Sequence, residues 1–106
     1  MLAVLVWSSL AFCGEIHDAA KNGDLEKVKA LLKANPDLVF SKDDKFGGTP
    51  LHLAAYWNHK DVLELLLTNK ADVNVRDNNG NTPLALAAHS NYTEVIELLR
   101  QHGGHE

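Results

Sequence analysis

The stretch TPLHLAA at residues 49–55 decides the fold, because it returns as TPLALAA at residues 82–88, a spacing of 33 in a chain of 106 residues. A Glu-Leu-Leu triplet follows each copy at the same distance. A looser third copy lies upstream, where Ala-Ala at 19–20 matches Ala-Ala at 54–55 at a spacing of 35. Repetition at such a period is typical of small units that bury their apolar faces by stacking on one another.

Each copy carries residues that begin and end helices. Thr49 and Thr82 are suited to accept a hydrogen bond from an unpaired N–H at a helix start, and a proline follows each at the first helical position. Gly23, Asn58 and Asn91 stand at equivalent turns and tolerate left-handed backbone. The apolar residues between positions 62 and 67 recur at helical spacing. The pattern predicts an all-α chain with helices at about 16–22, 25–34, 50–57, 60–68, 83–90 and 92–102.

These motifs resemble the ankyrin repeat, a family with a period of about 33 residues and the pattern Thr-Pro-Leu-His-x-Ala. The resemblance covers Ile16 to Gly104 and includes the sequence Ala-Asp-Val-Asn at residues 71–74. It implies a solenoid of three helix–turn–helix repeats with short projecting loops. The repeats are expected at about 15–43, 44–76 and 77–106, within a domain that spans residues 15–106.

Several residues depart from the pattern of the family. Lys70 and Asn35 stand where the family usually has Gly, and a non-Gly residue with positive φ is uncommon, so we expect strained or reshaped turns. Ala85 replaces the usual His, which removes a polar contact from repeat three. Arg100 stands where repeat two has Leu67. A polar residue at that position predicts a C-terminal cap and an array that is complete at three repeats.

Residues 1–14, MLAVLVWSSLAFCG, differ from the rest of the chain because they carry no charge. This change predicts a secretory signal at residues 1–14, cleaved after Cys13, and a secreted or periplasmic mature chain. Two alternatives stay open, namely a lipid anchor on Cys13 and an apolar extension of a cytoplasmic protein. The uncharged run is too short for a transmembrane helix, which takes about 20 apolar residues.

Charge and reactive side chains argue against several functions. Ten Lys and Arg against 14 Asp and Glu give a net charge of −4, so the broad basic surface that nucleic acid requires is missing. The chain has six histidines, but His52 and His59 occupy positions that the family uses structurally, and structural zinc takes about four ligands. Asp43 and Asp44 fit a solvated turn, with Asp44 at the turn position of the motif. We therefore expect no catalytic residue, no metal and no cofactor, and an enzyme-like role through the histidines is the alternative.

The residues that the scaffold does not dictate predict a binding surface. The resemblance implies that loop tips and the exposed face of each first helix contact the partner. Phe46, Tyr56, Trp57 and Arg76 include types that are enriched in interface hot spots. The alternative is that Tyr56 and Trp57 pack within the stack. The predicted protein-binding residues are Lys45, Phe46, Gly48, Tyr56, Trp57, Arg76, Asn78, Asn79, Asn81, His89 and Ser90, joined by Lys21, Asn22 and Ser41 from repeat one.

The predicted function is recognition of another protein by a rigid concave face, without any reaction. The chain is expected to be monomeric by itself, with no nucleic-acid partner and no membrane span. The alternative is a structural or regulatory subunit that stays docked on a larger protein.

Overall fold

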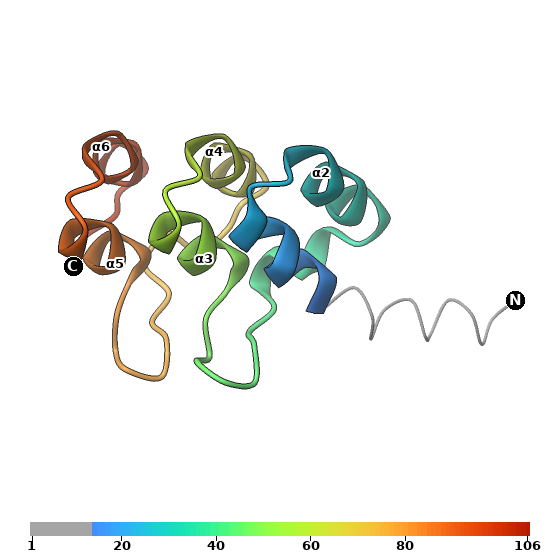
Figure 1. Ribbon diagram of the computed structural model, residues 1–106, viewed down its shortest axis with the longest axis horizontal. Helices are drawn as coiled ribbons and strands as arrows, with labels where there is room; N and C mark the ends of the chain where they lie inside the picture. Colours follow the sequence, from blue (N-terminus) through green and yellow to red (C-terminus); the bar gives the residue numbers. More distant parts are fainter. Residues whose placement is uncertain (1–13) are drawn as a thin grey trace, which may run out of the picture.

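The computed structural model describes residues 14–106, which form a row of helical hairpins (Figure 1). Residues 14–22 are helical and pair with α2 (Leu25–Ala34), after which a short 3-10 helix, η1 (Pro36–Phe40), leads into the second repeat. The second repeat consists of α3 (Pro50–Tyr56) and α4 (Lys60–Thr68), and the third of α5 (Pro83–His89) and α6 (Thr93–Gln101). The described residues contain no strand. The predicted all-α solenoid of three repeats is confirmed, and η1 is the element that the sequence did not predict.

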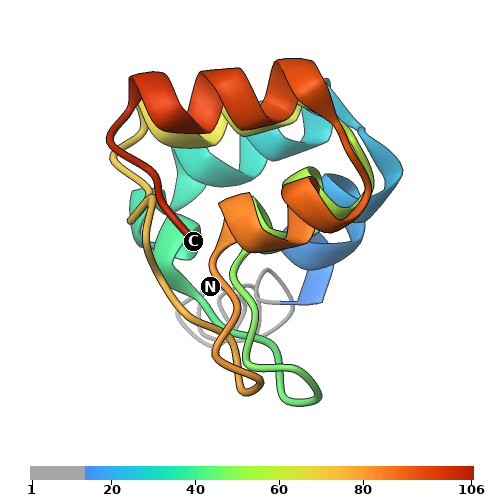
Figure 2. The same ribbon diagram turned by 90° about the vertical axis from the view of Figure 1, so that its left-hand side faces the viewer.

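The hairpins stack in two layers, which Figure 2 shows end-on. One layer holds the short first helices and the other holds α2, α4 and α6, while the loops between repeats project from one edge. The core lies between the layers, where Leu51, Leu63 and Leu66 are fully buried. Ala54 and Ala55 are also fully buried, and their small side chains allow the first helices to approach closely. Burial is therefore shared between neighbouring repeats.

Helix starts and interhelix turns follow the predicted chemistry. Thr82 Oγ1 accepts a hydrogen bond from the Ala85 N–H at 3.2 Å and caps α5. The left-handed turn residues are confirmed, because Gly23, Asn58 and Asn91 have φ values of 72°, 61° and 57°. These turns reverse the chain between the two helices of each repeat, since Gly and Asn adopt positive φ at the smallest steric cost.

The two predicted strained turns behave differently. Lys70 adopts the left-handed conformation with φ of 70°, as its position in the pattern predicts. Asn35 does not, because its φ is −150° and its backbone is extended. Pro36 follows Asn35, and a residue that precedes proline is restricted to extended conformations. The Asn35 side chain instead accepts a hydrogen bond from the Asp37 N–H at 3.2 Å and caps η1.

The predicted secretory signal and Cys13 lie outside the described residues, apart from Gly14. None of the helices within residues 14–106 has the length and apolarity needed to cross a membrane. At the other end, Arg100 is exposed on α6.

Candidate functional site

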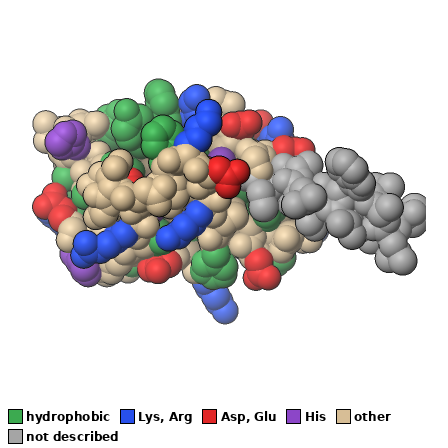
Figure 3. All heavy atoms as spheres, turned by 90° about the horizontal axis from the view of Figure 1, so that it is seen from below, with side chains coloured by type: hydrophobic (Ala, Val, Ile, Leu, Met, Phe, Trp, Pro, Cys, Tyr) green, Lys and Arg blue, Asp and Glu red, His purple; other side chains and the backbone are tan. Residues whose placement is uncertain are grey.

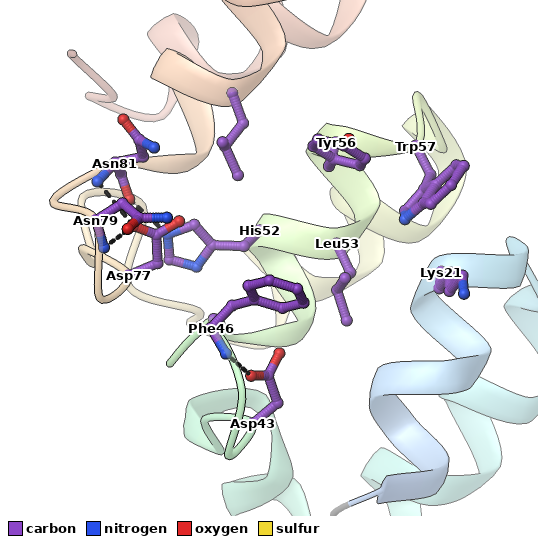
Figure 4. A pocket seen from close by; sticks show the side chains of 12 residues that line it. Lys21, Asp43, Phe46, His52, Leu53, Tyr56, Trp57, Asp77, Asn79 and Asn81 are labelled. Carbon is purple, nitrogen blue, oxygen red and sulfur yellow. Dashed lines mark hydrogen bonds between the residues drawn. The ribbon is translucent and has the colours of Figure 1, made fainter.

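An open groove of about 540 Å³ runs between the first helices and the projecting loops (Figure 4). Leu53 from α3 and Leu86 from α5 form its apolar floor, and Phe46 with Asn79 comes from the loops. Tyr56 and Trp57 close the groove at the end of α3. The other lining residues are Lys21, Asp43, Gly48, His52, Asp77 and Asn81.

The three repeats contribute different chemistry to this surface. Aligning the Ala-Ala pairs of the three repeats places Lys21, Tyr56 and His89 at one equivalent position, and Asn22, Trp57 and Ser90 at the next. All six residues are exposed. Repeat one therefore offers a cation, repeat two offers aromatic rings, and repeat three offers an imidazole and a hydroxyl as hydrogen-bonding groups.

The aromatic side chains of repeat two are exposed rather than packed within the stack. Phe46, Tyr56 and Trp57 are 60%, 51% and 45% exposed. The rings of Tyr56 and Trp57 meet edge to face, with centroids 5.2 Å apart and an interplanar angle of 73°. Lys21 Nζ lies 5.5 Å from the centroid of the Trp57 ring, a cation–π distance that helps to hold both side chains at the rim. The predicted exposure of these three aromatic residues is confirmed.

The loop that carries Phe46 is built on Asp43, not on Asp44 as the sequence alignment predicted. Asp43 Oδ1 accepts hydrogen bonds from the N–H groups of Lys45, Phe46 and Gly47 at 3.0, 2.6 and 3.1 Å. Asp77 plays the same part in the next loop, where its Oδ1 accepts from Asn79 and Asn81, both at 2.9 Å. The first loop is one residue longer, because the Asp43 N–H reaches Gly48 O whereas the Asp77 N–H reaches Asn81 O. A spacing of 33 therefore hid the true equivalence.

The backbone of Phe46 is held on both sides although its ring is exposed. Its N–H donates to Asp43 at 2.6 Å, and its carbonyl accepts from the Asn78 N–H of the neighbouring loop at 2.8 Å. Gly47, with φ of 64°, closes the turn next to it. A ring on a fixed backbone loses little conformational entropy when a partner covers it.

The histidines near the groove hold neighbouring repeats together. The His52 Nδ1 accepts from the Thr49 N–H at 3.0 Å, and its Nε2 lies 2.8 Å from Asn81 O, to which it donates. Burial lowers the pKa of His52, and the hydrogen bond to Asn81 opposes this shift only in part. The imidazole is therefore neutral at pH 7, with its proton on Nε2. Ala85 at the equivalent position of repeat three makes no such bond.

Two further histidines also cross between repeats. His17 Nε2 lies 3.1 Å from both Ser41 O and Gly48 O. His59 Nε2 lies 2.8 Å from Lys21 O, which fixes the end of the first helical segment beside the groove. The Nε2 atom of each of these histidines is therefore engaged with a backbone carbonyl of the adjacent repeat. Among residues 14–106, no three His, Cys, Asp or Glu side chains gather as metal ligands would.

The structure places most of the predicted binding residues on the loop side, with one correction. Lys45, Asn78 and Asn79 are exposed at the loop tips, and Arg76 is exposed just before the second loop. Gly48 was predicted at a loop tip but is buried at the base of the loop, where its carbonyl accepts from Asp43 and lies next to His17. It shapes the groove through its backbone and has no side chain to offer.

Sequence reasoning missed the floor of the groove. Leu53 and Leu86 precede the Ala-Ala pairs by one residue and line the groove half-buried. Their positions in the repeat could have predicted this role, because a leucine that precedes the Ala pair on a short helix faces the same side as the loops. Asp43 and Asp77 were missed as lining residues because they were interpreted only as turn residues.

Comparison with known proteins agrees with this architecture. The profile described as ankyrin repeats (3 copies) matches residues 16–106. The E3 ubiquitin-protein ligase XBAT33 of Arabidopsis thaliana is 48% identical over 61 residues, which cover 56% of this chain and 12% of that protein. M-phase phosphoprotein 8 of Homo sapiens is 41% identical over 64 residues, 60% of this chain and 7% of that protein. Inversin of Gallus gallus is 38% identical over 72 residues, 68% of this chain and 6% of that protein. The chain spans a small part of each relative, so the likeness concerns the repeats.

Proposed function

The chain belongs to the ankyrin repeat family, and we propose that it binds a segment of another protein in the groove between its loops and first helices. Ankyrin repeats are protein-interaction modules, and their fold is non-catalytic. The fate of the partner after binding, including any modification, is left to other proteins. What the groove supplies is a shaped surface with a fixed arrangement of apolar and polar groups.

One observation carries this proposal: Phe46, Tyr56 and Trp57 converge on a single groove while each stays about half exposed. Exposed aromatic surface lowers solubility and adds nothing to folding, and a contiguous apolar patch marks an interaction site. Aromatic side chains in a concave setting are also the type of residue that dominates binding energy. Phe40, at 52% exposure, is the remaining large exposed apolar side chain of the described residues, and it does not line the groove.

We infer that the chain performs no reaction. The imidazoles of His17, His52 and His59 support the stack through backbone carbonyls. Asp43 is engaged by three loop amides. The groove is also open along its length, whereas chemistry usually requires an enclosed site from which water is excluded.

The test is a comparison of two truncated aromatic side chains. Trp57→Ala is expected to weaken binding of a captured partner by about 2 kcal/mol or more, because Trp57 lies at the end of the groove. Phe40→Ala removes a similar exposed ring outside the groove and should leave affinity within about twofold. Affinity is measured by titration calorimetry, and circular dichroism checks the fold. If Trp57→Ala leaves affinity unchanged but lowers stability, the ring supports the fold and the proposal fails.

We propose that the chain is a monomer that binds and releases its partner. Outside the groove, Phe40 alone of the described residues exposes a large apolar side chain, whereas permanent interfaces are large and apolar. Size-exclusion chromatography of a native extract tests this proposal. Elution at the mass of the free chain would support reversible binding of the partner. Elution only within a larger complex would instead support a permanently docked subunit.

Export from the cytoplasm remains a further proposal, and its support is the uncharged apolar sequence at residues 1–14. Mass spectrometry of the natively expressed protein tests it. A chain that starts at Gly14 or Glu15 supports cleavage, and lipid on Cys13 supports an anchor. An intact Met1 contradicts both.

A further inference from the structure

We propose that the partner segment is acidic and carries a bulky apolar side chain beside its carboxylates. This inference rests on the proposed function and adds the chemistry of the occupant. It follows from the way in which charge is distributed on the loop side of the molecule, which Figure 3 shows from below.

Four cations on the loop side form what we call the cationic rim: Lys21, which lines the groove, and Lys42, Lys45 and Arg76, each of which is the chain neighbour of a lining residue. All four are exposed, and within residues 14–106 none of them belongs to an ion pair. Lys21 lies over the Trp57 ring, and Lys42 Nζ donates to the Arg76 carbonyl at 3.4 Å. Lys21 therefore lines the groove, and the other three cations stand next to it in the loops, without a carboxylate partner.

Three cations elsewhere in the chain form ion pairs. Lys60 pairs with Glu94 at 3.0 Å across the α4–α6 layer, and Lys27 and Lys29 pair with Glu15 and Glu26. The chain as a whole carries a net charge of −4. Lys33, Lys70 and Arg100 are also exposed and form no ion pair within residues 14–106. The cationic rim is therefore distinguished by its position beside the groove and not by the absence of ion pairs.

The aspartates of the same surface do not cancel the rim. Asp43 and Asp77 are half-buried and turn Oδ1 toward three and two loop amides respectively. Amide donors stabilise a carboxylate and draw it toward the backbone. Asp18 and Asp44 are exposed, but their side chains are much shorter than those of Lys and Arg. An approaching chain meets the long cationic side chains first, so that carboxylates are attracted and ammonium groups are repelled.

The other groups on this surface indicate which part of the bound segment lies on which repeat. The aromatic rings of repeat two accept a large apolar side chain above Leu53, next to Lys21 on the side of repeat one. On the side of repeat three, the carboxamides of Asn78, Asn79 and Asn81 make no hydrogen bond with the described chain, although their backbones do. Free carboxamides donate and accept, so they suit the peptide backbone or uncharged polar groups of the segment.

The experiment selects short random peptides displayed on phage against the full chain. The enriched peptides are expected to be acidic and to contain a large aromatic or aliphatic residue. Their affinity should fall by about tenfold between 0.05 and 0.5 M salt, because salt screens exposed charges. Enrichment of basic or uncharged peptides that still lose binding on Trp57→Ala would overturn the acidic partner and leave the proposed function standing. Enrichment that is indifferent to Trp57→Ala would overturn both.

Two double variants distinguish the effect of charge at the rim on peptide affinity from the effect of the net charge of the whole chain. Lys45→Glu with Arg76→Glu should weaken the selected peptides about tenfold or more, since each removes an attraction and adds a repulsion. Lys33→Glu with Arg100→Glu changes the net charge equally, at exposed residues of α2 and α6, in the layer of helices away from the projecting loops. That control is expected to change affinity by less than about twofold. Equal weakening by both double variants would overturn the rim as the site of recognition.

Discussion

Replacing Lys70 by glycine is expected to stabilise the protein, because the turn after α4 requires a conformation that lysine adopts at a cost. The φ of Lys70 is 70°, and left-handed backbone costs an L-residue roughly 1–2 kcal/mol. Glycine avoids that cost but loses more entropy on folding, by roughly 0.5–1 kcal/mol. The hydrogen bonds of the turn, from Lys70 N–H to Leu67 O and from Ala71 N–H to Leu66 O, both at 3.1 Å, are backbone bonds that the variant keeps.

The net gain is therefore about 0.5–1 kcal/mol in the free energy of unfolding, measured by urea titration with the slope unchanged. For a domain of this size the melting temperature should rise by about 2–6 °C. Asn35→Gly is the matched control, because it stands at the same position of the repeat but has extended backbone and caps η1. We expect it to lower stability by about 0.5–1 kcal/mol. If Lys70→Gly is neutral or destabilising, or if both variants stabilise, the reasoning about these two turns is wrong.

Three other predictions concern the core, the buried histidine and the groove. Leu66→Ala should lower the free energy of unfolding by about 2–5 kcal/mol in a thermal or urea titration, since Leu66 is fully buried, and a loss below about 1 kcal/mol would contradict its place in the core. His52 has a pKa below its ordinary value of 6.5, so the unfolded chain binds the proton more readily. Its stabilising contribution is complete above pH 6.5 and is lost as pH falls toward its lowered pKa. His52→Ala should make unfolding free energy depend less on pH in that range, and an unchanged slope would show that other groups cause it. Trp57→Ala should change the free energy of unfolding by less than about 1 kcal/mol, because the ring is nearly half exposed; a larger loss would assign it to the core.

The sequence was sufficient for the fold because each local signal agrees with the others. The Thr-Pro pair begins the first helix of repeats two and three, and Gly23, Asn58 and Asn91 reverse the chain at left-handed turns. These helix-start and turn residues alternate with helical stretches that carry an apolar face, and together they predict a single architecture. The exposure of Tyr56 and Trp57 followed from the same register, because the two positions after the buried Ala pair point away from the core.

The parts that sequence reasoning missed depend on neighbours rather than on position in the repeat. Asn35 occupies the position of Lys70, but Pro36 restricts it to extended backbone. Asp43 rather than Asp44 organises the first loop, because the loop has gained a residue and the carboxylate collects the amides within its reach. A fixed repeat spacing of 33 selects Asp44 and cannot locate such an insertion.

The surface chemistry of the groove was predictable only in part. Exposed residues at the loop tips were identified, but the lack of carboxylate partners for the cationic rim depends on which aspartates the loop amides engage. That distribution results from loop geometry and not from composition, which is acidic overall.

The most direct test of the account is amide chemical-shift mapping by NMR, with the isotope-labelled chain titrated with a captured partner or a selected peptide. The account predicts the largest changes at Phe46, Trp57 and Asn79, and at the Trp57 indole N–H, with small changes along α2, α4 and α6. If the largest changes fall on α2, α4 and α6 while the loops and α3 stay unperturbed, the protein binds through its other face and the account is wrong.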